Sequence, residues 1–144
     1  MPVERCVRWE PVSGIESPCG DIAFDCDASD RLSVTMHFSH MTDQPPRDLR
    51  LIFSGAISMR WEEESFGLNP LPDPLPQIGS GSHPTWTFPL LRVEHSVWLA
   101  AHEARETPLA AGRCHFALVA LNDLLQILAF PDVEAAWVDA PRNT

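Results

Sequence analysis

Alternating apolar and polar residues predict β-strands through the first half of the chain. The clearest run is 32–39, and the runs 49–53 and 56–62 repeat the pattern after short polar connections, so we expect 32–39 and 49–53 to form a hairpin. Shorter mixed runs at 5–12 and 21–26 also suit strands. The run 32–39 places four apolar side chains on one face, namely Leu32, Val34, Met36 and Phe38.

The second half combines a strand with one short helix. Residues 90–93 form an apolar run that stops at Glu94, and Ser96 then has the side chain of a helix N-cap. Apolar positions over 97–106 follow helical spacing, and Thr107-Pro108 ends the run. We therefore predict a helix that begins at Val97 and packs on the sheet.

Two apolar runs follow, at 113–121 and 124–130. Asn122-Asp123 between them tolerates left-handed backbone conformations, which favours a tight hairpin. A helix over 123–130 also fits the spacing, and we rank the hairpin first. Residues 133–138 suit either a last strand or a helical turn.

These elements predict an α+β domain, with a mostly antiparallel β-sheet of about five to seven strands and one main α-helix packed on it. At 144 residues the chain has the size of a single domain, 1–144. Alternating prolines followed by Gly and Ser predict a surface loop at 67–85.

Charge restricts the class of partner. Twenty acids oppose ten bases, all of them Arg, and the net charge is −10. An acidic surface repels phosphate backbones and attracts a basic protein, so we expect no direct nucleic-acid binding. Six of the acids lie within 10–30, and Glu62, Glu63 and Glu64 form a second cluster. A solvated face that keeps the protein soluble is the plainer interpretation of both clusters.

The chain lacks the usual sequence signals for membranes and disulfides. There is no apolar run of the ~18 residues that a span needs and no signal-peptide pattern, so we expect no membrane association and a cytoplasmic location. The four cysteines lack CxxC spacing, which favours reduced thiols, with a Cys19–Cys26 disulfide as the alternative.

Motifs for catalysis or cofactor binding are also missing. His37 and His40 are three apart, which in a strand places them on opposite faces, and Cys114 and His115 are adjacent and face opposite sides. No phosphate loop, dinucleotide fingerprint or nucleophile elbow occurs, so we expect no cofactor, no metal and no catalytic residues.

The order of motifs resembles small immunity proteins encoded beside bacterial polymorphic toxins. The similarity covers roughly half of the chain and rests on four segments: 51–53, 60–63 (Arg-Trp-Glu-Glu), 90–99 (Leu-Leu-Arg-Val-Glu-His-Ser-Val-Trp-Leu) and 115–131. It departs from such relatives at Phe116, where a Tyr often stands, and at Gln126, where an acid is common. The resemblance implies a protein that binds and blocks a cognate toxin delivered by contact-dependent or type VI secretion.

We therefore expect a non-enzymatic immunity protein that occludes the active site of a basic toxin domain, for instance a nuclease, with an acidic surface. One alternative is a small metal-dependent or hydrolytic enzyme that uses His37, His40 or His115 with nearby carboxylates. Another is an assembly partner that uses the loop 67–85. The candidate partner-binding residues are Asp25, Asp27, Asp30, Trp61, Glu62, Glu63 and Glu64.

Overall fold

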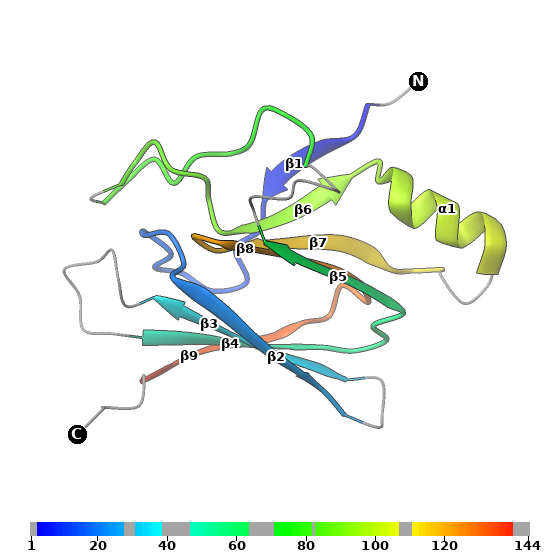
Figure 1. Cartoon of the computed structure of the whole chain (residues 1–144), viewed down its shortest axis with the longest axis horizontal. Helices are drawn as coiled ribbons and strands as arrows, with labels where there is room; N and C mark the ends of the chain where they lie inside the picture. The colour runs from blue at the N-terminus through cyan, green and yellow to red at the C-terminus, as the bar shows by residue number, and fades with distance from the viewer. Residues whose placement is uncertain are drawn as a thin grey trace.

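The computed structural model describes residues 3–27, 31–38, 47–63, 71–81, 83–106 and 111–139. Within these ranges the chain forms two antiparallel sheets and one helix, α1 (Val97–Glu106) (Figure 1). The five-stranded sheet has the order β1-β6-β7-β8-β5, and the four-stranded sheet has the order β2-β3-β4-β9. The strands are β1 (Arg5–Arg8), β2 (Asp21–Cys26), β3 (Leu32–Phe38), β4 (Arg47–Phe53), β5 (Ser58–Glu63), β6 (Leu90–Glu94), β7 (Cys114–Val119), β8 (Asp123–Ala129) and β9 (Glu134–Asp139).

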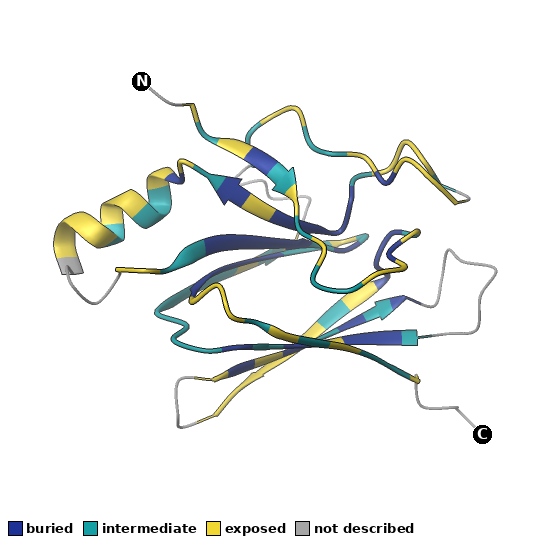
Figure 2. Ribbon diagram, turned by 180° about the vertical axis from the view of Figure 1, so that it is seen from behind, coloured by how far each residue is buried: buried dark blue, intermediate teal, exposed yellow. Residues whose placement is uncertain are grey.

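The two sheets face each other across one apolar core. Alternation along β3 buries every second side chain, and the same period on β7 and β8 turns Phe116 and Ile127 toward the four-stranded sheet. Phe116 meets Phe53 of β4 edge to face, with 5.3 Å between ring centroids. Figure 2 shows that the central strands carry most of the buried residues, whereas much of α1 is exposed.

The outer face of the five-stranded sheet is covered by α1 and by the segment 71–88. Trp98 of α1 packs against His115 of β7, and the Arg8 guanidinium lies 4.1 Å from the centroid of the Phe88 ring. Ile78 is fully buried and belongs to the core. The predicted surface loop at 67–85 thus contributes to packing in its described part, because Ile78 lies in the core and its carbonyl accepts from the Arg8 guanidinium of β1.

The two sides of the sandwich differ. On the side of β1 and β9, Trp9 bridges the sheets by contacting both Phe53 and Phe116, and Trp137 of β9 donates its indole N–H to the Ser13 carbonyl. On the opposite side, β2 and β5 are the outermost strands of their sheets. Figure 1 shows both strands at the front of the molecule, β5 in the upper sheet and β2 in the lower one.

The hairpin expected at the C-terminal half is confirmed, and the helical alternative for 123–130 is wrong. The two-residue loop of this hairpin is Leu121-Asn122, one position earlier than the predicted Asn122-Asp123. The loop is closed by a hydrogen bond from the Ala120 N–H to the Asp123 carbonyl at 2.8 Å. Left-handed conformations do not explain this turn, because His95 is the only non-glycine residue with positive φ in the described ranges. Instead, the Leu121 N–H donates to the Cys19 carbonyl, so a neighbouring segment supports the loop.

The predicted single sheet of five to seven strands is corrected to nine strands in two sheets within the described residues, where the mostly antiparallel architecture with one helix is confirmed. The reason is the Ser54-Gly55 turn after β4, where the chain leaves one sheet for the other. The helix begins as predicted, since the Leu99 N–H donates to Ser96 Oγ at 3.0 Å. Residues 134–139 are a strand.

Candidate functional site

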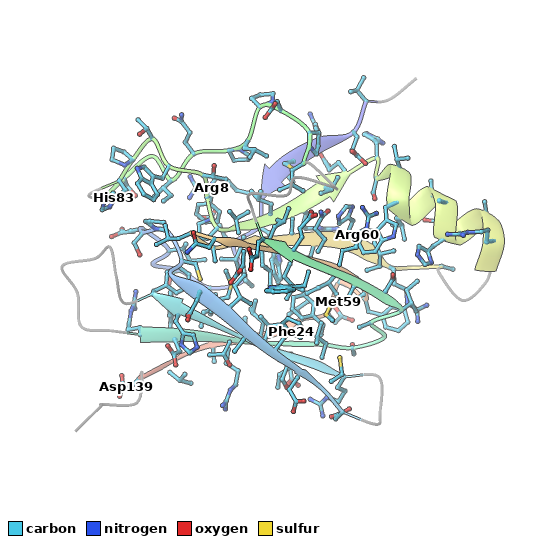
Figure 3. All side chains as sticks on the ribbon, viewed as in Figure 1. Arg8, Phe24, Met59, Arg60, His83 and Asp139 are labelled. Atoms are coloured by element: carbon cyan, nitrogen blue, oxygen red, sulfur yellow. The ribbon has the colours of Figure 1, made fainter. Side chains whose placement is uncertain are left out.

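Exposed aromatic side chains mark the side of the sandwich where β2 and β5 lie. Phe24 and Trp61 are 38% and 50% exposed, and both belong to faces that the alternation directs toward the opposite sheet. Figure 3 shows Phe24 on β2 and Met59 on β5 in the space between the two sheets. The core is therefore not closed by the described residues at these two edges, and large apolar rings remain accessible.

Three carboxylates gather at one end of these strands. Glu63 of β5 lies directly opposite Asp123 of β8, and Asp21 begins β2 nearby. Partial burial, with the negative charges of Glu63 and Asp21, raises the pKa of Asp123. The repulsion that Glu63 and Asp21 exert on Asp123 is unfavourable for the isolated protein. We define the β2–β5 edge surface as Asp21, Phe24, Asp25, Trp61, Glu63 and Asp123.

The structure brings only some of the predicted partner-binding residues together. Asp25 is exposed on β2. Asp27 lies just beyond the end of β2 that is far from Glu63, and the Asp27 carboxylate accepts a hydrogen bond from the Arg31 N–H. Glu62 faces away from Trp61, and both of its carboxylate oxygens are buried without a hydrogen-bond partner among the described residues. We therefore leave Glu62 out of the surface. Asp30 and Glu64 lie outside the described residues.

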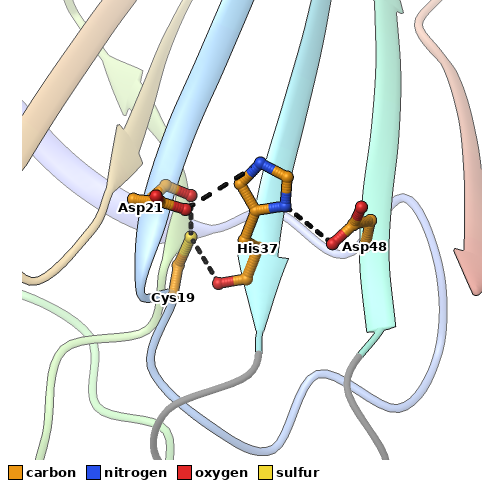
Figure 4. Close-up of polar contacts among 4 residues, drawn as sticks. All are labelled: Cys19, Asp21, His37 and Asp48. Atoms are coloured by element: carbon orange, nitrogen blue, oxygen red, sulfur yellow. Dashed lines mark hydrogen bonds and ion pairs between the residues drawn. The ribbon is translucent and has the colours of Figure 1, made fainter. Parts of the chain in front are cut away.

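A second polar cluster lies on the outer face of the four-stranded sheet. His37 stands between Asp21 and Asp48, which occupy directly opposite positions on β2 and β4 (Figure 4). Its Nδ1 donates to Asp48 Oδ1 at 2.7 Å, and its Nε2 lies 3.9 Å from Asp21 Oδ1. Asp48 is buried, so it fixes the imidazole orientation, while Nε2 remains directed at a solvent-exposed carboxylate.

The Cys19 thiol lies beneath this cluster and is fully buried, with the Asp21 and His37 carbonyls as its partners. Burial and the charge of Asp21 raise the pKa of Cys19, so the thiol stays protonated. All four cysteines are free, and the Cys19–Cys26 disulfide is absent. His40, the proposed companion of His37, lies outside the described residues.

His115 belongs to a buried polar network under α1. Its Nε2 donates to Gln126 Oε1 and its Nδ1 accepts from the Ser96 hydroxyl, both at 2.7 Å. Burial lowers the pKa of His115 to about 4, with a further contribution from the Arg60 charge. The Arg60 guanidinium stacks 3.7 Å from the centroid of the Trp98 ring, which meets His115 edge to face. Because Ser96 also accepts the Leu99 N–H, this network joins the helix cap to the sheet.

An open groove of about 660 Å³ runs beside the start of α1. Its walls include Trp9, Leu99 and Arg92, whose guanidinium donates to Cys114 Sγ at 3.0 Å. Glu10, Glu94 and Glu103 offset its arginines. The described residues contain no group of three His, Cys, Asp or Glu side chains that could hold a metal ion.

Sequence reasoning missed Asp21, Phe24 and Asp123 as surface residues and Asp48 as the partner of His37. A signal existed for Asp48, since a hairpin of β3 and β4 places it opposite His37. Asp21 and Asp123 come from different sheets, and their proximity depends on how the sheets stack, which local patterns do not encode.

No protein-family model, curated protein or solved structure matches this chain. None of the described helices has the length and apolar character needed to cross a bilayer.

Proposed function

We propose that this protein is a non-enzymatic binding domain of the immunity type, which neutralises a basic toxin by covering its active site with the β2–β5 edge surface. The observation that carries the proposal is the accessible Trp61 ring beside the acidic strand ends. Exposed tryptophans are frequent anchors of protein interfaces, and surrounding carboxylates supply charge complementarity to a basic cleft.

The acidic end of the surface supports binding over a purely solubilising role. Asp21 and Glu63 repel the Asp123 carboxylate in the free protein, and a basic partner would relieve that repulsion. Surface acids needed only for solubility have no reason to converge from two sheets.

Co-purification with the protein encoded by the adjacent upstream gene tests the proposal. We expect a stable complex and restored growth when both are expressed together. Trp61→Ala should weaken the complex by about 30-fold, as an interface anchor does. Trp86→Ala is the matched control, because Trp86 is 40% exposed on the 71–88 segment and away from β2 and β5, and it should leave affinity unchanged.

Thermal unfolding of both variants must match that of the parent protein for the comparison to hold. No complex and no rescue of growth, or equal effects of the two tryptophan variants, would sink the proposal.

A metal-dependent function is a second candidate because of His37. A buried carboxylate that orients one imidazole nitrogen while the other faces a second carboxylate is an arrangement common at metal sites. Titration with Zn²⁺ should then shift the His37 ring signals in NMR spectra, and His37→Ala should abolish the shift. Unchanged spectra at millimolar Zn²⁺ remove this candidate.

A further inference from the structure

Strand β2 presents an unpaired backbone edge. Among the described residues it pairs only with β3, and five of its six residues are exposed. An edge strand of this kind is a template for a further strand, because its outward N–H and C=O groups lack protein partners.

The register identifies which groups are available. The Asp27 N–H donates to the carbonyl of Arg31, the residue directly opposite, so these two form a hydrogen-bonded pair of the ladder. Hydrogen-bonded pairs recur at every second residue. The amides of Ile22, Phe24 and Cys26 therefore point away from β3, toward the open edge.

The other outermost strands are less suitable. β1 has four residues, and Trp137 of β9 is covered by the Arg47 guanidinium, 4.0 Å from the ring centroid. β5 is mostly half-buried, with Arg60 held against Trp98.

The charge of β2 determines the kind of added strand that can pair with it. Asp21 and Asp25 lie on the outer face of β2 with the small Ala23 between them, and Phe24 lies on the inner face. A second copy of β2 would bring its own acids to this edge, which disfavours self-pairing. A strand with Lys or Arg on one face and apolar residues on the other complements both faces of β2.

We propose that a basic, extended segment of the partner adds to β2 as a fifth strand of the four-stranded sheet. This inference rests on the proposed function and specifies how the partner binds. Main-chain hydrogen bonds to Ile22, Phe24 and Cys26 supply affinity, and the alternation of basic and apolar side chains supplies specificity.

A ten-residue peptide of alternating Lys and Val is the probe, with alternating Glu and Val as its control. Amide exchange of the whole protein, followed by NMR, should slow at Ile22, Phe24 and Cys26 with the Lys peptide only. Asp25→Lys should weaken binding about fivefold, as expected for one cross-strand charge pair. Glu103→Lys, the same charge change on the exposed side of α1, should have no effect.

Strand addition is overturned if the peptide slows amide exchange on β5 or at no residue. It is also overturned if the two Lys variants lose peptide affinity equally. Exchange in the toxin complex separates the two proposals. Trp61-dependent binding with unchanged β2 amides refutes strand addition and leaves the proposed function intact. Peptide protection of β2 without any toxin complex supports strand addition and refutes the proposed function.

Discussion

At the scale of single residues, His115 shows how a polar side chain is kept neutral in the core. Both ring nitrogens have partners, Ser96 and Gln126, and the residue is 4% exposed. A neutral imidazole satisfies this geometry, since one nitrogen donates and the other accepts. Protonation would place a donor against the Ser96 hydroxyl and a charge in the core.

We therefore predict acid destabilisation through His115. Its pKa falls from 6.5 to about 4 on folding, so between these values the unfolded chain binds the extra proton. Stability should be full above pH 6.5 and decrease as pH falls toward 4, by about 3 kcal/mol in total. Urea unfolding at a series of pH values measures this.

His115→Asn is the control, because an amide keeps hydrogen-bonding capacity without titrating. It should be less stable at pH 7 yet show a shallower slope between pH 6.5 and 4. An unchanged slope would assign the acid sensitivity to other groups.

At the scale of elements, sequence patterns predicted β3, β4, β6, α1 and the β7–β8 hairpin because each is specified by its own alternation or cap. They did not predict two sheets. From the local sequence alone, Ser54-Gly55 is compatible with either a bulge or a turn. The change of sheet at this point becomes evident from the tertiary structure, in which Phe53 packs against Phe116 across the core. The edge surface was missed for the same reason, as Asp21 and Asp123 meet only after the sheets stack.

The turn between the sheets makes a prediction at Gly55. This residue has φ +61°, and a Cβ there would overlap Cδ2 of Phe130, whose ring stacks on the Arg113 guanidinium. Gly55→Ala should therefore combine backbone strain with displacement of the ring, a loss of about 2 kcal/mol or more in the free energy of unfolding.

Gly79→Ala separates the two contributions. Gly79 has φ +77° with no atom within 4 Å of the added Cβ, so only the backbone strain of about 1 kcal/mol applies. Urea denaturation of both variants gives the comparison, and equal losses would mean that Phe130 moves aside without consequence.

At the scale of the whole molecule, the acidic end of the β2–β5 edge surface lowers stability, and in the proposed complex it would favour association. Burial and neighbouring acids raise the pKa of Asp123, and a carboxyl whose pKa rises on folding makes the fold less stable as pH increases through that pKa. Asp123→Asn should thus stabilise the free protein at pH 7, by less than about 1 kcal/mol because the group is partly solvated. If the proposed toxin is the partner, the same substitution should slow association with it, most strongly at low salt, and change dissociation little. Thermal unfolding and stopped-flow association at two ionic strengths measure both effects.

Glu103→Gln on the exposed side of α1 is the control, since it also removes one charge but lies away from this surface. A decrease in association rate of the same size in both variants would mean that net charge alone, rather than this acidic cluster, guides the partner.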